Sequence, residues 1–201
     1  MDMLADLQSK TGQGFTMEYG YQFKLGPNGQ YIFSPAVYGS GINQSISFTF
    51  NGSDGWTGCA HSHYAGCGNV FSFGDLPFIW MLRNVTPNIL SFMYGLATEH
   101  GYYFLTITDV VAYYQWWNKL FPDGIPNIEE IRRWEDMFND DYGVNNGSSL
   151  LSDEKALLKF LQENNIGLGV MKYNNLQDRF NRLMYYENID VLLEDECPPG
   201  E

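Results

Sequence analysis

Basic residues, histidine and cysteine are all scarce in this chain. It carries 11 Lys and Arg against 24 Asp and Glu, which gives a formal net charge of −13. Nucleic-acid partners are held by Lys and Arg contacts to phosphates, so this balance argues against nucleic acid as a partner. The 3 cysteines are too few for a disulfide framework. Whether Cys59 and Cys67 form a pair or remain free thiols is left open by the sequence.

Long apolar runs are also missing. No segment reaches the roughly 20 consecutive apolar residues that span a bilayer as a helix. The N-terminal stretch from Met1 to Asp6 lacks the basic region and apolar stretch of a signal peptide. We therefore expect a soluble chain without a membrane partner, with its compartment unspecified.

Aromatic and aliphatic residues, in contrast, are plentiful. The chain has 201 residues, of which 44% are hydrophobic and 16% aromatic. This is enough to bury a good core as one domain, or as one domain with an appendage.

The periodicity of the apolar residues divides the chain near residue 110. Before that point, strands are expected at 15–23, 31–34, 45–50, 56–63, 89–97 and 102–108, with a turn at 26–29 and a helix at 76–83. Beyond it, helices are expected at 110–121, 128–139 and 151–164, while 167–173 and 180–193 are ambiguous. The pattern predicts an α/β (α+β) sheet domain over residues 1–110 and a helical extension over 111–201. We expect this extension to pack on the domain without supplying catalytic groups, and to end in an acidic tail at 194–201.

Two of the 3 histidines stand one residue apart, in the stretch from Gly58 to His63. Residues two apart on a strand point to the same face, so His61 and His63 can bind one ion together. A glycine-rich loop then leads to Ser72 and Asp75. Two His and one Asp are three ligands, the number that a catalytic zinc site uses when its fourth position stays open for water.

Simpler interpretations exist for each of these residues. The histidines are also compatible with structural or surface positions on a strand. Ser72 and Asp75 have the spacing of a helix capping box, in which both side chains bind backbone amides. Pro77 disfavours a helix capped at Ser72, because the proline ring would fall at its fifth position and clash with the preceding turn.

The combined pattern His61-x-His63 and Ser72-x-x-Asp75, with an upstream glutamate, resembles the JAMM/MPN zinc metalloprotease family. It is most similar to the JAMM-like domains of bacterial Rhs and polymorphic-toxin proteins, and the resemblance covers roughly residues 14–110. It implies a cytidine-deaminase-like mixed sheet flanked by helices. It further implies that His61, His63 and Asp75 bind Zn²⁺, that Ser72 stabilises the oxyanion, and that Glu18 is the general base. This chain departs from the family in having eleven residues between His63 and Asp75, and in having Tyr64 where proline is common.

The resemblance implies a zinc-dependent metallopeptidase or isopeptidase that hydrolyses an amide bond with a zinc-activated water. Its partner would be a protein or peptide: a ubiquitin-like conjugate, a peptidoglycan peptide or the parent polypeptide. The alternative is a non-catalytic MPN-like interaction module or toxin-associated domain. A zinc deaminase is disfavoured because the chain has no Pro-Cys-x-x-Cys motif.

Other conspicuous residues are expected to be structural. His100 is predicted in an exposed turn, and Cys67 in the loop above the ion is expected to be an ordinary thiol. The aromatic residues from Tyr113 to Trp117 are predicted in the core of a helix packing. The acidic residues 136, 140 and 141 are expected at a solvated helix end.

Overall fold

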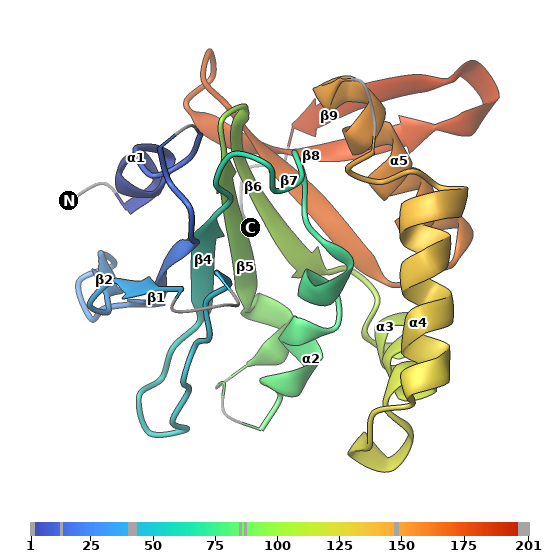
Figure 1. Ribbon diagram of the computed structural model, residues 1–201. Helices are drawn as coiled ribbons and strands as arrows, with labels where there is room; N and C mark the ends of the chain where they lie inside the picture. Colours follow the sequence, from blue (N-terminus) through green and yellow to red (C-terminus); the bar gives the residue numbers. More distant parts are fainter. Residues whose placement is uncertain are drawn as a thin grey trace.

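The elements of the first half were largely expected from the sequence. The computed structural model describes residues 3–12, 14–39, 44–84, 86, 88–146 and 149–196 (Figure 1). Up to residue 107 it contains α1 Met3–Gln8, β1 Tyr19–Leu25, β2 Tyr31–Phe33, β3 Val37–Tyr38, β4 Gly58–Ser62, the 3-10 turn η2 Phe73–Asp75, α2 Phe78–Met81, the 3-10 turn η3 Ile89–Ser91, β5 Met93–Thr98 and β6 Gly101–Ile107. The predicted hairpin is confirmed, because β1 and β2 pair antiparallel across the turn at Gly26 to Gly29.

Three predictions in this half were inaccurate. The strand expected at 89–97 starts later, because residues 89–91 form the 3-10 turn η3 and β5 begins at Met93. Residues 45–50 form no strand, although Ile46, Phe48 and Phe50 are half-buried and alternate with exposed residues as the pattern indicated. The segment packs its aromatic rings on the core and is not paired in the sheet, because β1 already lies between β4 on one side and β2 and β3 on the other. The expected helix at 76–83 is shorter, because Pro77 lacks an amide hydrogen and stands as the N-cap of α2.

The second half is not a purely helical extension, so the division at residue 110 was wrong in this respect. It contains α3 Val110–Leu120, the 3-10 turn η4 Pro122–Gly124, α4 Ile128–Asp136, the π-helical turn η5 Met137–Asp141, α5 Leu150–Glu163, β7 Leu168–Asn174, β8 Arg179–Tyr186, the 3-10 turn η6 Glu187–Ile189 and β9 Val191–Glu196. The three helices were predicted, but the ambiguous segments after them form strands. The part of the predicted acidic tail up to residue 196 lies in β9, and 197–201 fall outside the described residues.

The nine strands in the described residues belong to one mixed sheet with the order β2-β1-β4-β5-β6-β7-β8-β9, and β3 pairs with β1. The β4–β5 pair is parallel and the other pairs are antiparallel. Strand β7 lies directly beside β6, so residues from both halves of the chain form the middle of the sheet. The broad prediction of a mixed sheet flanked by helices is confirmed.

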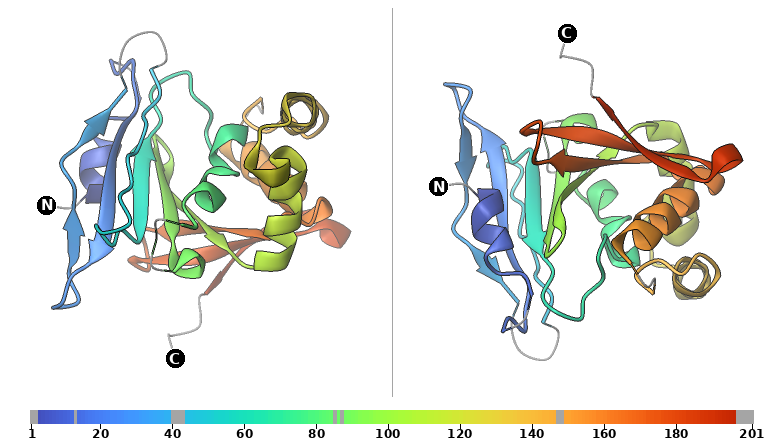
Figure 2. Two further views of the ribbon diagram at one scale, coloured as in Figure 1. Left: turned by 90° about the horizontal axis from the view of Figure 1, so that it is seen from below. Right: turned by 90° about the horizontal axis from the view of Figure 1, so that it is seen from above.

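The two faces of the sheet carry separate hydrophobic clusters. On β6, Tyr103 and Leu105 pack with α3 and α5, whereas Tyr102 and Phe104 pack with α1 on the opposite face. Figures 1 and 2 show α1 on one side of the central strands, with α3, α4 and α5 gathered on the other.

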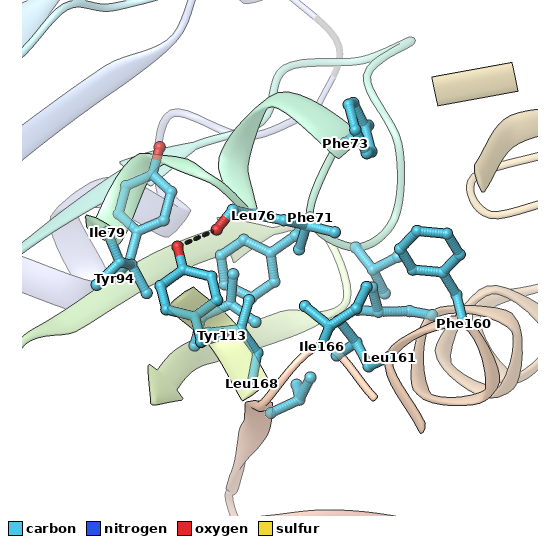
Figure 3. Packing of buried hydrophobic residues seen from close by; sticks show 14 of the residues in the cluster. Phe71, Phe73, Leu76, Ile79, Tyr94, Tyr113, Phe160, Leu161, Ile166 and Leu168 are labelled. Atoms are coloured by element: carbon cyan, nitrogen blue, oxygen red, sulfur yellow. Dashed lines mark hydrogen bonds between the residues drawn. The ribbon is translucent and has the colours of Figure 1, made fainter. Parts of the chain in front are cut away.

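The larger cluster joins the loop after β4 to the helices of the second half. Phe71, Phe73 and Leu76 from this loop pack among Tyr113 and Phe160, and the Tyr113 hydroxyl donates to the Leu76 carbonyl (Figure 3). The loop that follows His63 is therefore fixed by aromatic packing from α3 and α5. In the described part of the chain, no helix combines the length and apolar character needed to cross a membrane.

Candidate metal centre

Glu18 and His63 come together through the register of two antiparallel strands. Gly20 on β1 is the partner of His61 on β4, so the same register continued past the strand ends places Glu18 opposite His63. The backbone N–H of Tyr19 donates to the Ser62 hydroxyl at 3.1 Å, which supports the pairing at this point. The sequence had placed Glu18 within the first strand, but in the structure Glu18 immediately precedes β1. A sequence separation of more than 40 residues is thus closed by one strand pair.

The segment 44–50 crosses above β1 and holds the carboxylate of Glu18. The backbone N–H of Ile46 donates to Oε2 of Glu18 at 3.1 Å. Gly20 permits this crossing, because a Cβ at its position would meet the Ile46 side chain at 2.5 Å and the Phe48 ring at 2.6 Å. Glycine on β1 therefore brings the loop close enough to orient the glutamate.

Both histidines are buried, and each has its Nδ1 atom against a backbone carbonyl. Nδ1 of His61 lies 3.1 Å from the Gly95 oxygen, and Nδ1 of His63 lies 2.8 Å from the Gly68 oxygen. A carbonyl oxygen only accepts, so Nδ1 carries the hydrogen in both neutral rings and Nε2 keeps its lone pair. The two rings, with centroids 5.1 Å apart, are therefore prepared to act as metal ligands through Nε2.

Asp75 lies beside His61, with its Oδ1 atom 3.6 Å from Nε2 of the imidazole. Its other oxygen accepts from the backbone N–H of Ser72 at 2.7 Å and from the Ser72 hydroxyl at 2.8 Å. Ser72 is the N-cap of η2, and both halves of the capping box with Asp75 are present. The simpler interpretation of this pair therefore also describes its geometry, and Pro77 does not prevent it because η2 ends at Asp75. The Tyr94 hydroxyl donates to Oδ1 at 2.9 Å, and its ring stacks on His61. The carboxylate is thus held from three sides.

The tightest cluster of possible ligands contains the glutamate. Glu18, His61 and His63 each offer a ligand atom within 4.8 Å of those of the other two, and Asp75 does not join this group. The sequence had predicted His61, His63 and Asp75 as ligands, with Glu18 nearby as the base. The structure brings all four residues to one place, with Glu18 grouped with both histidines and Asp75 beside His61.

Burial controls the protonation of the centre. It lowers the pKa of His61 to about 4, against the attraction of Asp75, and it also lowers the pKa of His63. Burial alone would raise the pKa of Asp75, but the two histidines and the hydrogen bonds from Ser72 bring it below its usual value. Burial raises the pKa of Glu18 to about 7, against the hydrogen bond from Ile46. At neutral pH both imidazoles are therefore neutral, and Glu18 is poised to exchange a proton.

These shifts predict how acid affects the stability of the metal-free protein. A folded-state pKa near 4 for His61, below the ordinary 6.5, contributes stability that is present above pH 6.5 and lost as the pH falls toward 4. A folded-state pKa near 7 for Glu18, above the ordinary 4.5, contributes in the opposite direction over pH 4.5 to 7. We expect Glu18→Gln to make the acid loss of unfolding free energy steeper than in the wild type. Urea unfolding with a chelator at pH 4.5, 5.5 and 6.5 measures it, and parallel curves would contradict it.

Other residues singled out in the sequence are placed as follows. Cys59 and Cys67 are free thiols, the first buried and the second half-buried, and Cys67 is not part of the ligand cluster. His100 is exposed in the turn between β5 and β6, as predicted. Of the aromatic residues predicted in the core, Tyr113, Trp116 and Trp117 are buried, but Tyr114 is exposed on the outer side of α3, so the prediction was wrong for it. The acidic residues Asp136, Asp140 and Asp141 are exposed, as predicted.

Sequence reasoning missed Tyr94 and the carbonyls of Gly68 and Gly95. Tyr94 lies on β5, where the parallel register pairs it with Cys59 on β4. This pairing of strands has no signature in the sequence.

Comparisons of the chain with protein-family models, with curated proteins and with solved structures find no match.

Proposed function

We propose that the chain is a zinc-dependent metallopeptidase or isopeptidase of JAMM-like type, as the sequence motifs suggest. The observation that carries the proposal is the convergence of Glu18 with His61 and His63 in one buried cluster. The donor set fits zinc, which binds imidazole nitrogen and carboxylate oxygen. The tautomers fit as well, because both Nδ1 atoms are engaged by carbonyls and both Nε2 atoms remain for a metal.

In this proposal His61, His63 and Asp75 hold the ion. Zinc bound there would polarise a substrate carbonyl and lower the pKa of its water toward about 7. Glu18 takes up a proton during attack and delivers it to the leaving amine, a role for which a pKa near neutrality is suited. The Ser72 hydroxyl, which now donates to Asp75, turns to donate to the developing oxyanion. Tyr94 keeps Asp75 in position when Ser72 has turned away.

The first test is metal content. We expect the purified chain to bind one zinc, and His63→Ala to bind none at stoichiometric level, because two ligands of this set cannot close the site alone. His100→Ala is the matched control, since His100 is the remaining histidine of the 3 and lies exposed outside the cluster. Elemental analysis after dialysis, together with calorimetric zinc titration, measures both. A tightly bound zinc that survives in the His61→Ala/His63→Ala double variant would place the metal elsewhere.

The second test is hydrolysis. The zinc-loaded chain would be incubated with ubiquitin-like conjugates, with cross-linked peptidoglycan peptides and with its own polypeptide, and products would be identified by mass spectrometry. Cleavage of an amide bond that is lost in His63→Ala supports the enzyme. Zinc binding without cleavage of any of the three classes would favour the non-catalytic interaction module.

A further inference from the structure

Asn145, in the second half of the chain, forms a bidentate contact with the loop that follows β4. Its Oδ1 accepts from the backbone N–H of Val70 at 3.0 Å, and its Nδ2 donates to the carbonyl of Phe71 at 3.1 Å. The loop thus pairs with a side-chain amide from 74 and 75 residues away as it would with a neighbouring strand. The backbone next to Asn145 is held in place, because the preceding residue Val144 is fully buried and donates its backbone N–H to the Phe138 carbonyl at 3.1 Å.

A second contact from the same half fixes the residue next to Gly68. The Asn69 amide donates to Oδ2 of Asp153 at 2.6 Å, and Asp153 is a fully buried carboxylate in the first turn of α5. Gly68 itself lies directly against Asn145, because a Cβ on it would meet the side-chain amide at 2.0 to 2.4 Å. The backbone from Gly68 to Phe71 is therefore placed by Asn145 and Asp153.

The Gly68 carbonyl is also the partner of His63 Nδ1, at 2.8 Å. A direct chain of contacts consequently runs from Asn145 through the loop to one of the two histidines. The carbonyl can hold the ring in the Nδ1–H tautomer only while the loop keeps this position.

We propose that Asn145 is a positioning residue of the metal centre: through the loop of residues 68–71 it fixes the orientation and tautomer of His63, so that the second half of the chain tunes metal affinity. The expected change in zinc affinity rests on the proposed zinc function, whereas the expected change in the His63 tautomer does not. Asn145 touches neither the ligands nor a substrate in this role. It acts on His63 only through the backbone.

The test compares two asparagine-to-glycine variants. Asn145 has a positive φ of 62°, so glycine removes its side chain without the backbone strain that alanine would add. Asn165, with a φ of 47°, is the matched control, because it is exposed in the same half of the chain and lies outside the loop contacts. We expect Asn145→Gly to weaken zinc binding about tenfold, the low end of what outer-shell changes cost. Asn165→Gly should leave it unchanged.

The imidazole tautomers separate positioning from simple loss of stability. Nitrogen-15 NMR of the metal-free protein reports them directly, and the 3 histidines are assigned with His63→Ala and His100→Ala. We expect the Nδ1–H form of His63 in the wild type and in Asn165→Gly, and a mixture of both tautomers in Asn145→Gly. His61, whose Nδ1 partner is Gly95, should not change.

An unchanged His63 tautomer together with unchanged zinc affinity in a folded Asn145→Gly protein would overturn the proposal. Lower thermal stability with both readouts unchanged would equally overturn it, because the asparagine would then be merely structural. If wild-type protein binds no zinc, the proposed function fails, while the tautomer comparison still decides the role of Asn145. Should Asn145→Gly not fold, Asn145→Asp keeps the acceptor for Val70 and loses the donor to Phe71, and the same two readouts apply.

Discussion

Glu18→Gln is expected to lower amide hydrolysis by about 10²–10⁴-fold while the protein remains folded and keeps its zinc. This is the range that a positioned acid–base group contributes to a reaction. Glutamine keeps the size of the side chain and can still accept from the backbone N–H of Ile46, but it cannot take up the proton. Because Glu18 has its pKa raised to about 7 by burial, a neutral amide there should not disturb the fold at neutral pH.

The turnover and zinc content of Glu18→Gln are compared with those of two other variants. His63→Ala should lose zinc and turnover together, which separates a ligand from a base. Glu129→Gln is the control, since Glu129 is an exposed carboxylate on α4, far along the chain from the cluster. Wild-type turnover in Glu18→Gln would refute the base assignment. Loss of zinc as complete as in His63→Ala would make Glu18 a ligand. The geometry allows this outcome, because Glu18 has a ligand atom within 4.8 Å of those of both histidines.

The local part of this centre could be predicted from the sequence. His61 lies near the end of β4 and His63 directly follows the strand, two residues on, so the two rings lie close together, and Asp75 follows at the end of a short loop. Glu18 needed the resemblance as well, since only the β1–β4 register brings it opposite His63. Its spacing along the chain carries no such information.

The parts that sequence reasoning missed depend on long-range packing. The alternation at Ile46, Phe48 and Phe50 correctly gave one buried face, but burial against aromatic rings imposes the same alternation as a sheet does. The segments 167–173 and 180–193 looked ambiguous, and neither β7 nor β8 alternates regularly: β7 has three buried residues followed by four half-buried ones, and β8 mixes all three classes of burial. Their assignment as strands depends on the free edge of β6, which the sequence does not display.

Asn145 and Tyr94 illustrate the same limit at single residues. Asn145 lies in a polar loop, where asparagine is ordinarily explained by a turn, and its positive φ agrees with that explanation. Its contacts to Val70 and Phe71 arise only when α5 and the loop after β4 meet. The sequence-based division at residue 110 therefore separated Asn145 from the site that it supports.

The last prediction follows from this shared architecture: a chain ending at Val110 should not fold cooperatively and should bind no stoichiometric zinc. Strand β6 would lose β7, its partner on one side. Removing α3 and α5 would also uncover large side chains of the core, namely Phe71, Phe73, Leu76, Leu96 and Leu105. Each buried side chain of this size contributes about 1.5–3 kcal/mol, so the loss is on the order of 10 kcal/mol. That equals most of the 5–15 kcal/mol by which a typical domain is stable.

Circular dichroism, two-dimensional amide NMR and zinc analysis of residues 1–110 measure the outcome. Co-expression of residues 111–201 as a separate chain is the control, because it restores the β6–β7 pair and the contacts of Asn145 without a covalent link. We expect the two pieces to associate and to bind one zinc together. A dispersed spectrum and one bound zinc for residues 1–110 alone would instead show that the sheet up to β6 is self-sufficient. In that case the second half, Asn145 included, would be dispensable for the metal centre.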